Sequence, residues 1–133
     1  MKQKSEKVKI KKIKKVAGGR GCLNIHSNFN NSIITITRES GEKLAQVSSR
    51  TATGYRGTKK STSYAVQKAA EVALAKINEF GISTVIIKIR GVGSGWGAAI
   101  KKFCGTDNLQ VERIEDKIAF PFNGCRPRKA PRK

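Results

Sequence analysis

Acidic side chains are scarce in this chain, and their scarcity limits the partners it can bind. Its 133 residues include 9 Asp plus Glu against 28 Lys plus Arg, so the formal net charge is +19. Such a balance favours a polyanion over a neutral or cationic partner. Nucleic acid is the leading candidate, and an anionic membrane surface is the weaker alternative.

Long apolar runs are also missing. No stretch approaches the roughly 20 apolar residues that a membrane-spanning helix needs. Met1 is followed by alternating lysines rather than by the apolar core of a signal peptide. We therefore expect neither a secreted protein nor a membrane protein.

Cysteine and histidine are too few and too scattered for a metal site. Cys22, Cys104 and Cys125 lie far apart without a Cys-x-x-Cys pair, and His26 is the only histidine. Neither a disulfide framework nor a zinc knuckle fits that spacing. Reduced thiols are typical of a cytosol-like compartment, including an organelle matrix. We predict no metal and no cofactor, and we interpret His26 as an ordinary residue of a strand.

The few acids also argue against an enzyme. A nuclease needs clustered carboxylates to hold two magnesium ions, and the region of the last predicted strand offers only Glu112, Glu115 and Asp116. A single histidine leaves few ways to activate a nucleophile. We therefore expect a binding protein without a small-molecule substrate.

The positive charge is concentrated at the two ends of the chain. Residues 1–20 hold nine Lys/Arg and one Glu, net +8, and residues 117–133 hold six basic residues and no acid, net +6. The longer middle region, 21–116, carries only +5. Blocks of like charge repel themselves, so we predict two disordered basic arms that flank one folded domain and become ordered on a polyanion.

The middle region alternates between strand and helix patterns. It predicts a three-stranded meander, a loop over 51–60, a helix capped by Ser61 or Ser63 that runs to Phe80 and ends at Gly81, and then a strand, glycine loop, helix and strand. The expected strands cover 22–29, 33–38, 44–48, 82–90 and 109–114, and the short helix covers 98–104. The unbroken β-branched run around Ile86 predicts a strand covered on both faces. These elements indicate a mixed α/β sandwich.

The glycine-rich loop over 91–97 precedes the short helix. Glycines permit close backbone approach, and the amides at a helix N-terminus favour an anion, so we expect a nucleic-acid phosphate there. Two other interpretations stay open: a tight turn without a ligand, and a mononucleotide site. The loop lacks the spacing of a dinucleotide fingerprint and the ending of a P-loop.

Two basic segments complete the candidate interface. In the loop from Arg50 to Lys60, Tyr55 can stack on an unpaired base while its basic side chains contact phosphates. In the C-terminal segment 123–133, prolines favour an extended backbone, and Arg126 and Arg128 can each grip a phosphate with two hydrogen bonds.

Four ordered motifs carry a resemblance to a known family. They are I-H-S-N-F-N-N-S-I-I-T-I-T at 25–37, G-Y-R-G-T-K-K-S-T-S-Y-A-V-Q at 54–67, the strand and glycine loop at 85–97, and N-G-C-R-P at 123–127. From about Gly21 onward the chain resembles the universal family of small-ribosomal-subunit proteins numbered eleven, of bacterial or organellar type. The resemblance implies a three-layer α/β/α sandwich with a mixed five-stranded sheet.

It also implies a role and a set of partners. The expected role is structural: binding small-subunit rRNA at the platform, between rRNA helices near the mRNA exit and the Shine–Dalgarno cleft. The expected neighbours are the small-subunit proteins numbered seven and eighteen and the mRNA, in a bacterial cytoplasm or an organelle matrix. The runners-up are an architectural DNA- or RNA-binding protein outside the ribosome and a nucleotide-binding enzyme.

The resemblance and the basic segments together give a set of expected rRNA-binding residues. They are Asn28, Asn30, Asn31, Tyr55, Arg56, Lys59, Lys60, Ser61, Thr62, Gly91, Gly93, Gly95, Trp96, Asn123, Arg126, Arg128, Lys129, Arg132 and Lys133. The chain departs from the family pattern at Val92, usually proline, at Trp96-Gly97, usually arginine and an acid, and at Phe122, usually histidine. Trp96 then either stacks on a base or packs against protein.

Overall fold

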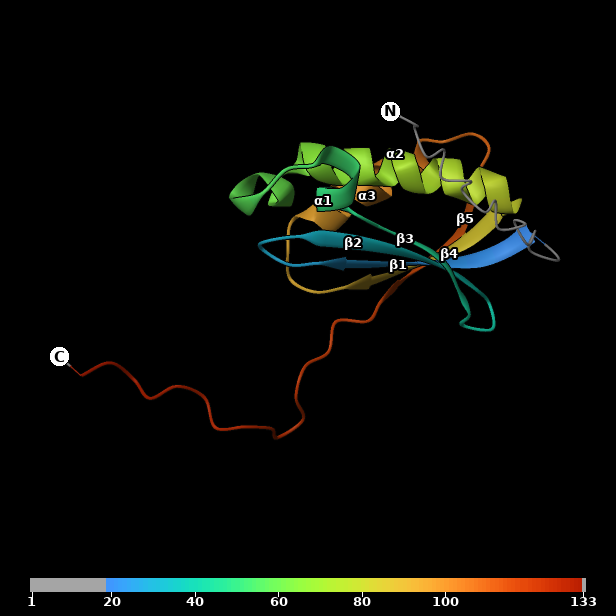
Figure 1. The fold of residues 1–133 in the computed structure, drawn as a ribbon. Helices are drawn as coiled ribbons and strands as arrows, with labels where there is room; N and C mark the ends of the chain where they lie inside the picture. The colour runs from blue at the N-terminus through green and yellow to red at the C-terminus, as the bar shows by residue number, and fades with distance from the viewer. Residues whose placement is uncertain (1–18, 133) are drawn as a thin grey trace, which may run out of the picture.

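The computed structural model describes residues 19–132. Five strands form one sheet in the order β3-β2-β1-β4-β5, and helical segments connect them (Figure 1). The elements are β1 Arg20–Ser27, β2 Ser32–Arg38, β3 Lys43–Ser48, α1 Ser49–Thr53, the short 3-10 helix η2 Gly57–Ser61, α2 Ser63–Phe80, β4 Thr84–Arg90, α3 Gly95–Cys104 and β5 Gln110–Asp116.

The sheet is mixed. β2 runs antiparallel to both β1 and β3, whereas β1, β4 and β5 run parallel to one another. The predicted meander and the predicted strand-helix-strand unit are therefore confirmed, as are the α/β class and the mixed five-stranded sheet.

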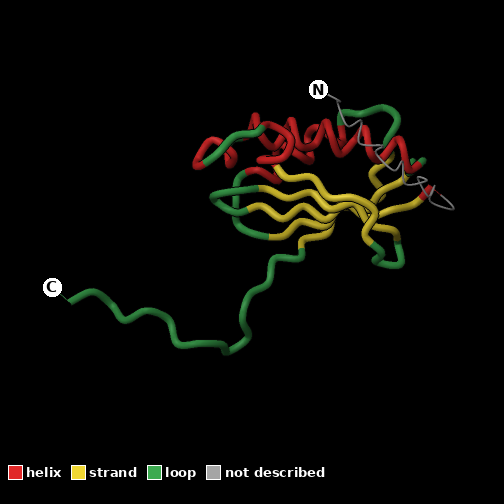
Figure 2. Tube along the Cα trace, in the orientation of Figure 1, coloured by secondary structure: helices red, strands yellow, loops and turns green. Residues whose placement is uncertain are grey.

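All three α-helices lie on one face of the sheet, so the described residues form two layers rather than the expected three-layer sandwich (Figures 1 and 2). The chain crosses from β3 to β4 and from β4 to β5 in the same direction along the sheet. Right-handed crossovers in one direction place their helices on the same side. In β4, Val85, Ile87 and Ile89 are buried, while Ile86 and Lys88 are partly exposed. The prediction of a strand covered on both faces is therefore wrong.

Helix α2 covers the sheet as the sequence predicts. Its N-cap is Thr62 rather than the expected Ser61 or Ser63, because the Thr62 Oγ1 accepts a hydrogen bond from the backbone N–H of Ala65 at 3.4 Å. The helix ends at Gly81 as expected. Alanines on the buried face let the helix approach the sheet closely, and larger buried side chains such as Ile77 fill the remaining space. Each fully buried branched side chain contributes about 1.5–3 kcal/mol to stability.

The segment between β3 and α2 differs from the predicted loop. Ser48 is the N-cap of helix α1, because its hydroxyl accepts a hydrogen bond from the backbone N–H of Thr51 at 3.1 Å, and Gly54 is the C-cap. Helix η2 follows directly and leads into α2. Helices as short as α1 and η2 are difficult to recognise in a polar, glycine-containing stretch of sequence.

The structure describes most of the predicted C-terminal arm but little of the predicted N-terminal arm. Residues 1–18 of the expected N-terminal arm lie outside the described residues, and β1 begins at Arg20. Residues 117–132 form neither helix nor strand, and they extend away from the sheet (Figure 2). Among the described residues, no helix is both long and apolar enough to cross a membrane.

Candidate nucleic-acid interface

Three of the predicted binding segments meet at one edge of the sheet. The turn 28–31 joins β1 to β2, the segment 49–62 follows β3, and the loop 91–94 follows β4. Because β1, β3 and β4 all point the same way, the carboxyl ends of these strands lie at the same edge (Figure 1). Residues that are far apart in the sequence therefore form one surface, which we call the loop edge.

The asparagine turn is held by its own side chains. Asn28 Oδ1 accepts hydrogen bonds from the backbone N–H groups of Asn30 and Asn31, at 2.9 and 2.7 Å. Asn31 Oδ1 in turn accepts a hydrogen bond of 2.6 Å from the Ser49 hydroxyl. Asn28 and Asn31 thus shape the turn, while Asn30 and the neighbouring Phe29 are exposed at its tip.

Buried serines connect the turn to helix α1. The hydroxyls of Ser27 and Ser32 lie 2.8 Å apart, and the backbone N–H of Ser32 donates to Ser49 Oγ at 3.3 Å. All three serines are fully buried or nearly so. Sequence reasoning did not identify them, because no spacing marks a serine that bonds across strands. They fix two of the loops relative to each other before any ligand binds.

The glycine loop packs tightly on the same turn. The backbone N–H of Gly93 donates to the Ser27 carbonyl at 3.0 Å, and an added Cβ at Gly93 would lie 2.5 Å from the Asn28 carbonyl oxygen. A Cβ at Gly95 would lie 2.5 Å from the Ser32 hydroxyl. Both glycines are buried, so close packing accounts for them. Val92 and Trp96 are exposed in this region. Trp96 lies in the first turn of α3, and that turn contains no acid.

The basic segment after β3 encloses a shallow pocket. The pocket has a volume of about 260 Å³ and is lined by Arg50, Arg56, Gly57 and Lys60. No carboxylate lines it, and guanidinium groups bind phosphate oxygens through paired hydrogen bonds. The structure thus adds Arg50 to the predicted residues. The sequence feature that could have identified Arg50 is its position at the start of the basic stretch.

The predicted hydroxyl residues at the end of this segment are engaged in local bonds. Ser61 donates to the Thr58 carbonyl at 2.8 Å, and Thr62 donates to the Lys59 carbonyl at 2.7 Å. These bonds hold η2 and the start of α2 in place. The side chain of Lys59 is exposed beside them.

An aromatic pair lies next to the pocket. The rings of Tyr55 and Tyr64 have centroids 6.4 Å apart and are tilted by 32°, and the Lys68 ammonium lies 5.7 Å from the Tyr64 ring centroid. Both tyrosines are exposed. Exposed aromatic faces beside cations are typical of surfaces on which unpaired bases stack. Tyr64 was not among the predicted residues.

Lys68 and Lys102, on α2 and α3, are both paired with one acid. Glu71 forms ion pairs with Lys68 at 3.0 Å and with Lys102 at 3.2 Å. The hydrogen bond from Lys68, followed by that from Lys102, holds the pKa of the Glu71 carboxyl below its ordinary value, and Glu71 raises the pKa of Lys68.

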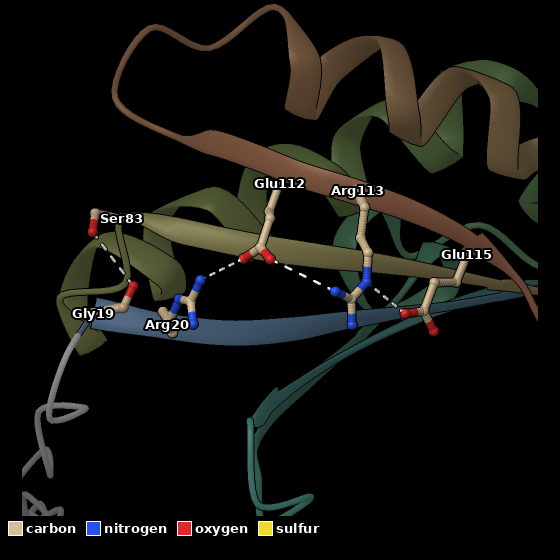
Figure 3. A network of polar contacts seen from close by, with 6 residues as sticks. All are labelled: Gly19, Arg20, Ser83, Glu112, Arg113 and Glu115. Carbon is tan, nitrogen blue, oxygen red and sulfur yellow. Dashed lines mark hydrogen bonds and ion pairs between the residues drawn. The ribbon is translucent and has the colours of Figure 1, made fainter.

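A second set of ion pairs lies along β5. Arg20 pairs with Glu112 at 3.0 Å, and Arg113 contacts Glu112 at 3.6 Å and Glu115 at 2.7 Å (Figure 3). Glu115 also contacts Lys117 at 3.4 Å. Arg113 holds the pKa of Glu115 below its ordinary range, and Glu115 raises that of Arg113. Glu112 and Glu115, considered above as metal ligands, are therefore partners of cations, whereas Asp116 accepts a hydrogen bond of 2.9 Å from the backbone N–H of Ile118. Among residues 19–132 no group of three or more His, Cys, Asp or Glu could hold a metal ion.

The C-terminal segment is not brought to the loop edge. It leaves β5 with the backbone N–H of Lys117 bonded to the Ile89 carbonyl at 2.8 Å and then extends outward (Figure 1). Its predicted residues within the described range, Asn123, Arg126, Arg128, Lys129 and Arg132, are all exposed, and Lys133 lies outside that range. Phe120 and Phe122 contact each other edge to face at 5.0 Å and are also exposed.

The fold and the site together define an α/β protein with a preformed, basic loop edge and an extended basic segment. Residues 21–132 match the family described as ribosomal protein S11, and the chain belongs to this family. The resemblance seen in the four motifs is thereby confirmed. A family of ribosomal proteins also agrees with the prediction of a chain that is not an enzyme.

Curated relatives match the chain over nearly its whole length. The chain is similar to the small ribosomal subunit protein uS11 of Nautilia profundicola, with 44% identity over 129 residues, which cover 97% of this chain and 98% of the relative. The protein of the same name from Nitratiruptor sp. is 43% identical over 92% of this chain and 93% of its own length. That from Helicobacter pylori strain 26695 is 44% identical over 92% of both chains.

Proposed function

We propose that this chain is a structural constituent of the small ribosomal subunit and binds small-subunit rRNA in support of translation. The observation that carries the proposal is the loop edge, where three segments distant in sequence form one surface with an acid-free pocket of arginines and lysine. The membership of the ribosomal protein S11 family and the names of the relatives support it.

The proposed place is the platform, where the chain bridges rRNA helices near the mRNA exit and the Shine–Dalgarno cleft. The proposed neighbours are the small-subunit proteins numbered seven and eighteen and the mRNA. These finer points rest on the resemblance of the motifs to the family. The relatives named above come from bacteria, which supports a bacterial ribosome over an organellar one.

The proposed mechanism is electrostatic and architectural. The loop edge offers a rigid shape and a phosphate pocket, while the extended segment 117–133 neutralises phosphates along its length. Specificity comes from RNA shape and unpaired bases rather than from a base code. Tyr55 and Trp96 are the proposed stacking residues.

Removal of residues 123–133 tests the role of the extended segment. The deletion takes away five basic residues. The logarithm of affinity falls with the logarithm of salt concentration, and each lost phosphate contact makes this negative slope shallower by roughly 0.7–0.9. We expect a weaker affinity for small-subunit rRNA and a salt dependence that is shallower by roughly 3.5–4.5 units of slope if all five residues contact phosphates. A slope equal to that of the full chain would refute phosphate binding by this segment.

Crosslinking tests the proposed function as a whole. Ultraviolet crosslinking in a lysate should attach small-subunit rRNA to peptides that include 50–60 and 123–133. Crosslinks scattered over messengers, or an equal affinity of the purified chain for random duplex DNA, would favour the architectural alternative outside the ribosome. Saturable mononucleotide binding that is lost on Gly93→Ala would favour the enzyme alternative.

A further inference from the structure

The face of the sheet opposite the helices has two unlike halves. Along β5 and at the start of β1, cations and acids are matched in the ion-pair network of Arg20, Glu112, Arg113 and Glu115 (Figure 3). Near the carboxyl ends of β1 and β4, the same face is hollowed. The hollow has a volume of about 610 Å³ and is lined by Asn24, Ile25, His26, Thr35, Lys88, Arg90 and Lys117. We call it the open-face hollow.

Strand register gathers the polar side chains of this hollow. On the parallel strands β1 and β4, Asn24 is the register partner of Lys88 and His26 is the partner of Arg90. Thr35 lies beside Asn24 on β2. Neighbouring strands are about 4.8 Å apart, so residues from three strands and Lys117 surround one depression. The sequence places these residues too far apart for the cluster to be recognised from spacing.

The charge of the open-face hollow is unbalanced. None of its lining residues is acidic, and within residues 19–132 neither Lys88 nor Arg90 forms an ion pair. Glu115, the register neighbour of Lys88 on β5, is already held by Arg113 and Lys117. The paired charges along β5 and the unpaired Lys88 and Arg90 of the hollow point to an anionic ligand at the hollow.

We propose that the open-face hollow binds the sugar–phosphate backbone of an RNA strand, as a second RNA surface beside the loop edge. The proposal rests on the proposed function, since it takes RNA as the polyanion. Lys88, Arg90 and Lys117 pair with phosphates, while the Asn24 amide and the Thr35 hydroxyl offer donors and acceptors to ribose hydroxyls. The volume lies within the range of about 300–1,000 Å³ that is usual for ligand sites.

Other occupants fit the hollow less well. The segment 117–133 contains no acid, so its charge repels the cations that line the hollow. A partner helix that presents only an apolar face would cover Lys88 and Arg90 without offering either of them a counter-charge. An acidic protein surface is the remaining competitor, and the experiments below separate it from RNA.

Charge-neutralising variants of the full chain provide the first test. We expect K88Q/R90Q to make the negative slope of log affinity for small-subunit rRNA against log salt shallower by roughly 1.4–1.8. The matched control is R113Q, which lies on the same face within the ion-pair network and should leave the slope unchanged. The exchange K88R/R90K keeps both charges and should also retain the slope. Thermal unfolding of every variant separates a binding loss from a folding loss.

The outcomes of this test discriminate clearly. A slope of K88Q/R90Q equal to that of wild type overturns the open-face hollow, even when R56Q/K60Q at the loop edge lowers it. A wild-type chain that binds rRNA no better than random duplex DNA instead overturns the proposed function. In that case the hollow still stands as a polyanion site if K88Q/R90Q lowers the slope on that DNA.

Site-specific crosslinking identifies the class of partner. A benzophenone amino acid in place of Thr35, in chains incorporated into whole ribosomes, should crosslink to RNA. The matched control replaces exposed Glu39, in the turn at the opposite end of the sheet, and should give no RNA crosslink. A crosslink from position 35 to protein alone would overturn the proposal in favour of an acidic protein surface.

Discussion

Two glycines on either side of the α3 N-terminus should respond to alanine in opposite directions. Gly91 has a φ of +89°, and an added Cβ there would overlap the carbonyl oxygen of Ser27. That φ costs an alanine about 1–3 kcal/mol. Moving Ser27 away would also weaken its 3.0 Å hydrogen bond from Gly93, at about 1 kcal/mol. We therefore expect Gly91→Ala to lower the free energy of unfolding by about 2–4 kcal/mol.

Gly97 is the matched control. It lies inside α3, has no positive φ, and an added Cβ there would meet no atom within 4 Å. Alanine at this position should raise the free energy of unfolding by up to about 1 kcal/mol, because it favours the helix. Urea titration at constant m-value gives both changes, and for Gly91→Ala thermal unfolding should show a midpoint lower by roughly 8–16 °C. A Gly91→Ala chain as stable as wild type would refute the packing role of this loop.

Three further predictions concern single side chains. Tyr55→Ala should weaken rRNA binding by about 1–3 kcal/mol while Tyr55→Phe retains it, and equal affinities would exclude stacking. Trp96 is the only tryptophan and is 37% exposed, so saturating rRNA should change its fluorescence emission; an unchanged spectrum would place the start of α3 outside the interface. Lys68 and Lys102 lower the pKa of Glu71 from 4.5, so the stability from these contacts is present above that pH and is lost as the pH falls through the lowered pKa. Glu71→Gln should therefore lose less stability on acidification than wild type, as measured by urea unfolding at neutral pH and well below 4.5.

The sequence predicted the elements of the fold well where local patterns and tertiary packing agree. The alternation around Ile34 and the helical spacing that includes Ile77 both correspond to observed elements, because each pattern places apolar side chains on the buried face. The number of layers could not be obtained in this way. The β-branched run around Ile86 is compatible with a strand covered on one or both faces, and only the direction of the two crossovers decides between them.

The candidate site was predicted in part for a similar physical reason. Basic and aromatic residues such as Arg56 and Tyr55 are recognisable in a chain with little acid, and the structure places both at the loop edge. Ser49 and the open-face hollow around Lys88 were not recognised, because they depend on strand register and cross-strand contacts. The glycines were identified correctly as special positions, and their observed packing explains Gly93 without a ligand.

The charged network along β5 also protects the chain before it meets RNA. β5 is an outermost strand, so its free edge offers unpaired backbone groups to any other extended chain. Glu112, Arg113 and Glu115 cover this strand with charge, and the register shift opposite Val85 and Ile86 breaks its regular ladder. Both features oppose the addition of a further strand. The ion pairs described above as a balanced part of the sheet face thus also oppose edge-to-edge association between copies of the chain.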